Sequence, residues 1–197
     1  MRQPVHIVNS AGQFLNQWRT AQGSFYVSSS LEPDFVDGDV VWSKPLPGML
    51  KLNVDAVLFS DEGATGLGWI LRDSHGCFLK ACSIHLFGLL NSGEAEAVSI
   101  REALSWLRQQ ALDNVLLETD AKQVVDLIRK PDSSSALGLV VDDCISLLKH
   151  FGNVSVRFVR RSANEAAHRC ARAAHYMSGS REWSSTPLFL HSVLSVD

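Results

Sequence analysis

Three strand patterns in succession, followed by alternating helices and strands, constrain the fold of this sequence more than any other feature. The strands are predicted at about 49–59, 64–72 and 77–87, and the first alternates apolar and polar residues. The segment Asp73-Ser74-His75-Gly76 is typical of a tight turn, so the last two strands form an antiparallel hairpin. The glycines between 63 and 68 run into a strand rather than a helix, which favours a loop or bulge over a phosphate-binding loop.

The remainder of the sequence predicts four helices and two more strands. The helices fall at about 91–111, 121–129, 137–151 and 162–176, and the strands at about 115–119 and 154–160. Asn91 and Ser92 are typical caps for the first helix, and Ser162 with Glu165 predicts a capping box for the last. The order βββαβααβα predicts an α/β fold with a five-stranded mixed sheet, three antiparallel strands then two parallel, flanked by helices.

The predicted domain boundaries leave one core domain between two flanking segments. Residues 1–41 are predicted to be a linker or helical extension, with a polar helix around 11–22. The core domain spans 42–178, and Pro45 and Pro47 predict an extended lead-in to its first strand. The tail at 179–197 carries Trp183 and apolar residues around Leu188, so we expect it to dock on the domain.

Composition places the chain among ordinary globular proteins and excludes several function classes. At 197 residues and 46% hydrophobic, it has enough apolar residues for one core. The net charge of −3 argues against broad, charge-driven nucleic-acid binding but permits a local basic patch. No stretch approaches the roughly 18 apolar residues of a membrane span, so we expect no membrane association.

The expected location is intracellular. The four cysteines form no Cys-x-x-Cys pair, so they indicate neither a zinc site nor a disulfide framework. The N-terminus lacks the layout of a secretory signal. These features favour the nucleus or cytoplasm, while the absence of acids from the first 31 residues leaves an organellar transit peptide open.

Three acidic residues occupy positions where the predicted elements can bring them together. Asp55 lies in mid-strand on the face opposite the apolar residues, and Asp120 ends the strand predicted at 115–119. Glu96 lies one turn into a helix on its apolar stripe, whereas Glu94, two residues earlier, faces nearly the opposite way. Carboxylates aimed inward from three elements repel one another unless a cation lies among them. The pattern therefore predicts a divalent metal site.

Each acid also has a purely structural alternative. Asp55 could be a surface acid of an edge strand, although its mid-strand position favours a metal-binding role. Glu96 could be an acid placed to interact with the helix dipole, and Asp120 could cap the next helix.

Four short segments, taken together in their order and spacing, form a recognisable set. They are Lys51-Leu52-Asn53-Val54-Asp55-Ala56, Glu96-Ala97-Val98-Ser99-Ile100-Arg101-Glu102-Ala103-Leu104, Glu118-Thr119-Asp120-Ala121 and Arg161-Ser162-Ala163-Asn164-Glu165-Ala166-Ala167-His168. With them, the sequence resembles the ribonuclease H family over roughly residues 42–190, in its plant, non-LTR-retrotransposon branch, where the domain accompanies a reverse transcriptase.

The resemblance implies a function, a cofactor and a set of site residues. It implies hydrolysis of the RNA strand of RNA–DNA hybrids, without strong sequence specificity, by a retrotransposon-derived nuclease. It implies two Mg²⁺ ions, for which Mn²⁺ could substitute, and no small-molecule cofactor; we expect a monomer. The catalytic, metal-binding residues would be Asp55, Glu96, Asp120 and His168, and the nucleic-acid-binding residues would be Arg160, Arg161 and Asn164.

One departure from the family leaves a second function open. His168 stands where the family usually has Asp, and imidazole suits Mn²⁺ or Zn²⁺ better than Mg²⁺. The sequence does not separate a ligand at this position from an ordinary packed histidine, nor a phosphate contact from a solvated turn at Arg160 and Arg161. A catalytically weak, hybrid-binding module of the same fold is therefore the alternative to a nuclease. The candidate basic patch consists of Arg157, Arg160, Arg161, Arg169 and Arg172.

Overall fold

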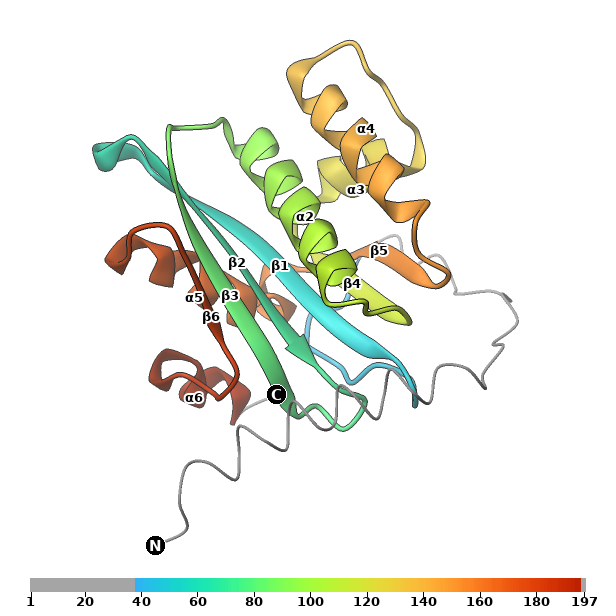
Figure 1. Cartoon of the computed structure of the whole chain (residues 1–197), viewed down its shortest axis with the longest axis vertical. Coiled ribbons are helices and arrows are strands. Elements are labelled where there is room, and N and C mark those ends of the chain that lie inside the picture. Colours follow the sequence, from blue (N-terminus) through green and yellow to red (C-terminus); the bar gives the residue numbers. More distant parts are fainter. Residues whose placement is uncertain (1–37, 196–197) are drawn as a thin grey trace, which may run out of the picture.

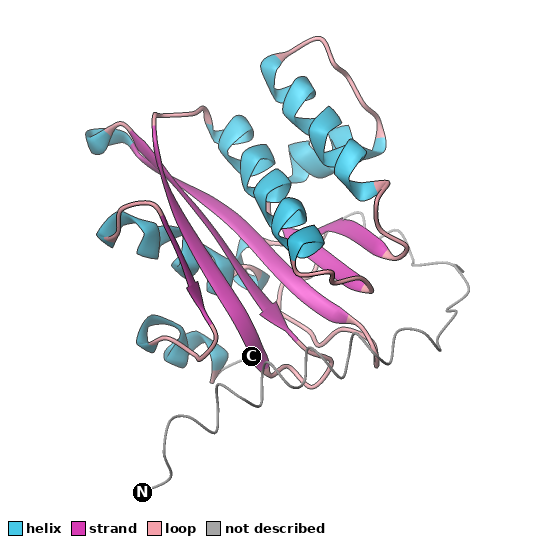
Figure 2. Ribbon diagram, viewed as in Figure 1, coloured by secondary structure: helices cyan, strands magenta, loops and turns pink. Residues whose placement is uncertain are grey.

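The computed structural model of the chain describes residues 38–195, which form a sheet with helices on both faces (Figures 1 and 2). The polar helix predicted around residues 11–22 lies outside the described residues. Within the described part, no helix combines the length and the apolar character that crossing a bilayer requires.

The sheet has six strands in the order β5-β4-β1-β2-β3-β6. Neighbours β1, β2, β3 and β6 run antiparallel, whereas β4 runs parallel to both β1 and β5. The α/β class, the mixed sheet and the predicted order of the first five strands along the chain are confirmed. The strands are β1 (Leu50–Phe59), β2 (Ala64–Arg72), β3 (Phe78–Phe87), β4 (Val115–Thr119), β5 (Val154–Phe158) and β6 (Ser180–Trp183).

The predicted count of five strands is wrong, because the tail adds a sixth. Strand β6 pairs antiparallel with β3, with Trp183 opposite Ala81 and Ser180 opposite Ile84. Its four residues, Ser-Arg-Glu-Trp, show no alternation of apolar side chains, so no strand pattern was visible. The strand forms because the edge of β3 presents backbone donors and acceptors that the tail can pair.

Three helices cover the first face of the sheet: α2 (Ser92–Gln109), α3 (Lys122–Arg129) and α4 (Ala136–Leu148). Helix α2 begins with a capping box, in which the Asn91 side chain accepts from the Glu94 backbone N–H and the Glu94 carboxylate accepts from the Asn91 N–H. Its apolar stripe, including Ile100 and Leu104, is fully buried against the sheet. This packing fixes the first turns of α2 over the central strand β1.

Two helices cover the second face: α5 (Glu165–Ala173) and the short α6 (Leu188–Leu194). Helix α5 approaches the backbone of β2 so closely that a Cβ at Gly68 would lie 2.0 Å from the Ala171 nitrogen. A small apolar cluster seals this layer, and α6 of the tail contributes Leu190 to it. The buried members are Ile70, Ala81, Ala166, Ala167, Cys170 and Leu190.

The capping box predicted at Ser162 and Glu165 is wrong. Residues Arg161–Ala163 form a single 3₁₀ turn, η3, and α5 begins at Glu165 with no capping side chain at Asn164. The Ser162 hydroxyl instead donates to the carbonyl of Val40. The side chain that the local pattern assigned to the helix cap therefore bonds to a residue distant in sequence.

The lead-in before β1 lies against the sheet as part of the fold. The Trp42 indole nitrogen donates to Asn53 Oδ1 at 3.0 Å, and the Arg72 guanidinium lies 3.4 Å from the centre of the Trp42 ring. Upstream of Trp42, Asp39 forms a parallel bridge with Val159. Lys51 and Asn53, which share a strand face with Asp55, thus lie in a buried polar network that includes Glu118.

All four cysteines lie within the described residues and are free thiols. Cys82, Cys144 and Cys170 are buried, and Cys77 is exposed in the turn before β3. Burial raises the pKa of Cys82 and of Cys144 to about 12, so these thiols remain neutral and behave as small apolar residues.

Candidate active site

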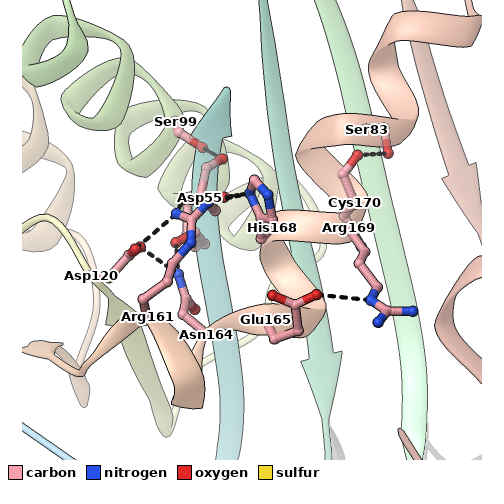
Figure 3. Close-up of polar contacts among 11 residues, drawn as sticks. Asp55, Ser83, Ser99, Asp120, Arg161, Asn164, Glu165, His168, Arg169 and Cys170 are labelled. Atoms are coloured by element: carbon pink, nitrogen blue, oxygen red, sulfur yellow. Dashed lines mark hydrogen bonds and ion pairs between the residues drawn. The ribbon is translucent and has the colours of Figure 1, made fainter. Parts of the chain in front are cut away.

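Asp55 lies in the middle of the central strand β1, and its side chain is completely buried. Because side chains alternate between the two faces of a strand, Asp55 points away from the face of Leu52 and Val54, which belong to the core under α2. The Ser99 hydroxyl of α2 donates to the backbone carbonyl of Asp55 at 2.8 Å and fastens the helix at this point (Figure 3).

The other two predicted acids reach Asp55 from neighbouring elements. Strand β4 pairs in parallel with β1, with Thr119 opposite Val54, so Asp120 emerges beside Asp55. Glu96 lies in the first turns of α2, and the backbone N–H of Ala56 donates to its carboxylate. Glu94 is engaged in the capping box, which supports the choice of Glu96.

The three acids converge as the sequence predicted. One carboxylate oxygen from each of Asp55, Glu96 and Asp120 lies within 4.8 Å of the other two. The convergence follows from the fold, because a strand centre, a strand end and a helix start meet at one point. Their assigned catalytic role stays a prediction.

Burial and mutual repulsion disfavour negative charge in this cluster. Burial raises the pKa of Glu96 to about 9, and the charges of Asp55 and Asp120 add to the effect. Burial likewise raises the pKa of Asp55, against the opposing influence of a hydrogen bond from His168. Three carboxyl groups in one place thus need a compensating positive charge to ionise together.

The donor set fits a hard divalent cation. The Glu96 Oε2 atom is buried and finds no hydrogen-bond partner among residues 38–195, although a buried carboxylate oxygen is normally satisfied. Mg²⁺ and Mn²⁺ prefer carboxylate oxygens, and three such oxygens from different elements leave room for water and a phosphate oxygen. The unpartnered oxygen is the atom that such an ion would satisfy.

His168, the proposed fourth ligand, contacts the cluster but lies outside the three converging oxygens. It is partly buried on α5, and its Nδ1 lies 2.8 Å from Asp55 Oδ2. The same nitrogen also faces the Arg161 guanidinium, so it either donates to Asp55 or accepts from Arg161. Its role as a metal ligand stays a prediction.

Arg161 points into the site rather than outward to solvent. Its Nη1 donates to Asp55 Oδ1 at 3.0 Å and to Asp120 Oδ2 at 2.8 Å (Figure 3). Partial burial works against the charge, but the hydrogen bond to Asp120 and the charge of Asp55 outweigh it, so the pKa of Arg161 is raised. The adjacent Arg160 is exposed and lines a surface pocket of about 370 Å³ together with Asp120 and Lys122.

Asn164 is fully buried behind the carboxylates. Its side-chain amide donates to the Val54 carbonyl at 2.9 Å and to Asp120 Oδ1 at 2.8 Å. It thereby ties the start of α5 to the central strand and orients Asp120. Its assignment to nucleic-acid binding stays a prediction.

Besides Arg161, two arginines of the predicted basic patch form ion pairs within the protein. Arg157 contacts Glu118 at 2.6 Å and Asp39 at 2.9 Å. Arg169 contacts Glu165 at 3.0 Å and hydrogen-bonds Ser192 of α6. These charges are therefore partly neutralised. Arg160 and Arg172 are exposed, and Arg161 is half-exposed.

The sequence analysis missed Ser99 as a residue of the site. It is a buried polar side chain on the apolar stripe of α2, and that mismatch was visible in the sequence. Its partner, the Asp55 carbonyl, lies on another element, so only the fold reveals the contact.

Residues 53–174 match the model of the family described as Reverse transcriptase-like. A protein of Arabidopsis thaliana with a provisional ribonuclease H name is 26% identical over 164 residues, which cover 82% of this chain and 26% of that protein. The chain thus spans about a quarter of that relative's length. The matched region contains Asp55, Glu96, Asp120 and His168.

Solved structures show that the fold is that of ribonuclease H. The ribonuclease H1 of the archaeon Halobacterium salinarum has a TM-score of 0.59 at 21% identity, covering 65% of this chain and 98% of its own. A compost-derived ribonuclease H1, solved with an RNA/DNA hybrid, has a TM-score of 0.56 at 17% identity, covering 64% and 95%. The N-terminal ribonuclease H domain of a Mycobacterium tuberculosis protein also has a TM-score of 0.56, at 19% identity, covering 64% and 92%.

Proposed function

Because the chain belongs to the Reverse transcriptase-like family, we propose that it is a metal-dependent endonuclease that hydrolyses the RNA strand of RNA–DNA hybrids without strong sequence specificity. The proposal includes an origin in a plant retrotransposon, which is supported by the Reverse transcriptase-like family together with the relative from the plant Arabidopsis thaliana. The observation that carries the proposal is the convergence of Asp55, Glu96 and Asp120 from three elements, with one buried Glu96 oxygen unpartnered among residues 38–195.

In this proposal the three acids hold the metal, and His168 is a candidate fourth ligand. Two bound Mg²⁺ or Mn²⁺ ions would supply an activated water and stabilise the leaving oxygen during an in-line displacement. The chain itself fixes the carboxylates in place: Ser99 holds β1 to α2, and Asn164 holds Asp120. This rigid arrangement lowers the reorganisation needed when the phosphate arrives.

The substrate side of the proposal rests on the surface around the acids. Arg160 and Arg172 are exposed near the site, and Arg161 is half-exposed at its rim, so each is a candidate phosphate contact. A hybrid would be selected by its shape and its 2′-hydroxyls rather than by base sequence. Such recognition agrees with a chain whose overall charge is slightly negative.

The test is cleavage of an end-labelled RNA–DNA hybrid in Mg²⁺ and in Mn²⁺, with DNA duplex and single-stranded RNA as comparison substrates. We expect cleavage of the RNA strand of the hybrid alone. Asp55→Asn keeps the shape of the side chain but removes its charge, so it should lower the rate at least about 100-fold. A hybrid left intact by the unmodified protein in both metals would rule out the nuclease.

A second candidate is a hybrid-binding module with little turnover. It is favoured by His168 at a position where the family usually has a carboxylate, and by the Arg161 guanidinium between two of the acids. This function predicts saturable hybrid binding without cleavage even at high Mn²⁺ concentration, measured by fluorescence anisotropy on the same labelled hybrid.

A further inference from the structure

We propose that Arg161 is a resident cation of the carboxylate site, and that divalent metal ions bind by displacing its guanidinium. The inference rests on the proposed function in one respect, because it takes the three acids to be a metal site. It adds a competition between a side chain and the metal for the same oxygens.

The geometry places the guanidinium on two of the three acids. Arg161 Nη1 lies 3.0 Å from Asp55 Oδ1 and 2.8 Å from Asp120 Oδ2. A metal ion shared by Asp55 and Asp120 must approach carboxylate oxygens to about 2.0–2.2 Å, between the same two side chains. The guanidinium and a directly bound ion therefore compete for this position.

The local charge balance makes the guanidinium replaceable. One arginine faces Asp55, Glu96 and Asp120, so net negative charge remains available to attract a divalent ion. The Arg157–Glu118 pair on the same face of the sheet is different, because Glu118 also contacts Lys51 at 2.7 Å. Two cations therefore contact Glu118 and balance its charge fully, so these contacts have a structural role.

Arg161 can also leave without breaking the fold. Its side chain is 49% exposed, whereas Arg157 is 19% exposed. The backbone of its 3₁₀ turn is held independently, by the Ser162 hydroxyl on the Val40 carbonyl and by Asn164 on Val54. Rotation of the side chain toward solvent is therefore enough to open the site.

The experiment is a Mn²⁺ titration of the full chain without nucleic acid, in which free Mn²⁺ is followed by electron paramagnetic resonance. We expect Arg161→Gln to bind Mn²⁺ roughly three- to tenfold more tightly than the unmodified protein, because it removes a charged hydrogen-bond donor from two ligands. Arg161→Lys keeps the charge but not the fork of two donors, so its affinity should lie between these two.

A matched variant separates direct competition from general electrostatics. Lys122 lines the pocket beside Asp120, but its ammonium lies over the Phe158 ring, 5.9 Å from its centre. Lys122→Gln removes the same charge near the site, and we expect it to change the Mn²⁺ affinity less than about twofold. Equal tightening in both variants would mean that Arg161 acts only through its distant field, and would overturn the proposal.

Thermal unfolding gives a second readout. Without metal, Arg161→Gln leaves the acids uncompensated and should lower Tm; saturating Mn²⁺ should close most of the gap, because the ion replaces the missing charge. If Arg161 has only a structural role, Arg161→Gln lowers Tm by the same amount with and without Mn²⁺, and that result would overturn the proposal. Unchanged or weaker Mn²⁺ binding by the variant would overturn it as well. Since no substrate is present, a failure to cleave hybrids leaves this result intact.

Discussion

Glu96 and Asp55 are carboxyl groups held where the protein favours their neutral forms. Burial raises the pKa of both, and the charge of Asp120 adds to the rise in each. In the metal-free protein the folded state therefore retains a proton on Glu96 that the unfolded chain releases at much lower pH. A bound cation would favour the ionised forms of both groups.

The proton retained on Glu96 predicts how stability depends on pH in the absence of metal. The pKa of Glu96 rises from 4.5 to about 9 on folding, so between these pH values the folded state binds more protons than the unfolded state. The free energy of unfolding should then fall as pH rises from 5 to 9, by up to about 1.4 kcal/mol per pH unit from this group. Urea denaturation in EDTA measures the slope, and Glu96→Gln should flatten it. Parallel profiles for the two proteins would show that Glu96 does not cause the slope.

Replacing the unusual residue of the site predicts a gain. His168→Asp restores the hard anionic ligand expected at this position, beside Asp55. The Mg²⁺-supported rate of hybrid cleavage should rise, by a factor on the order of 10. The metal-free Tm should fall, because a fourth acid joins the cluster. As a control, His175→Asp makes the same change on the neighbouring η4 turn (Ala174–Tyr176) and should leave the rate unchanged. If His168→Asp is no faster than the unmodified protein, His168 is not the ligand that limits the rate.

At this scale the sequence revealed the acids but not the direction of Arg161. Asp55 stood out because a carboxylate in mid-strand is a poor choice unless it has a partner. Arg160 and Arg161 are adjacent and chemically identical, so no pattern in the sequence separates them. The 3₁₀ turn decides which one reaches the carboxylates, and that turn depends on the contact of Ser162 with Val40.

At the scale of elements, α5 packs directly on the backbone of β2. A Cβ at Gly68 would lie 2.0 Å from the Ala171 nitrogen and 2.4 Å from the Cys170 carbonyl carbon, both backbone atoms that cannot rotate aside. Helix α5 carries His168, and Asn164 immediately precedes it. The position of the helix on this strand thus determines where two side chains of the site lie.

Gly68→Ala should therefore damage both stability and activity. We expect a loss of roughly 1–3 kcal/mol in the free energy of unfolding, because the helix must move outward. Hybrid cleavage should fall further than stability alone explains, since Asn164 would no longer hold Asp120. Gly93→Ala in the first turn of α2 is the matched control, because its Cβ would meet only side-chain atoms, the nearest of them on Leu137 at 3.3 Å. Equal stability of the two variants would contradict the close packing.

The elements that the sequence predicted poorly are those defined by contacts with distant segments. Strand β6 has three polar residues out of four and forms against the edge of β3. The glycines of β2, which favoured a loop or bulge, are instead a requirement of α5, because only a missing side chain admits the helix. Elements with strong periodicity, such as β1 and α2, were predicted within a few residues of their observed ends.

At the scale of the whole molecule, the second face of the sheet is closed by residues beyond the matched family region. The family model covers 53–174, whereas β6 and α6 lie at 180–194. Leu190 of α6 is completely buried against Ile70, Ala81 and the α5 residues of the second cluster. The tail is therefore part of the hydrophobic core.

Two leucines of the same helix test this conclusion. Leu190→Ala should lower the free energy of unfolding by about 2–5 kcal/mol, since it creates a cavity in the second cluster. Leu188→Ala, at a side chain that is 85% exposed, should change it by less than about 0.5 kcal/mol. Both are measured by urea denaturation. If Leu190→Ala costs no more than its neighbour, the tail is dispensable to the core.

The contact of Asp39 and Val40 with the segment around the η3 turn determines where the chain can be shortened without disturbing the site. Asp39 pairs with Val159 and Arg157, and Val40 receives the Ser162 hydroxyl, so two residues upstream of Trp42 steady the turn from which Arg161 extends. A fragment cut at the first strand would keep every acid of the site and still lose this anchorage.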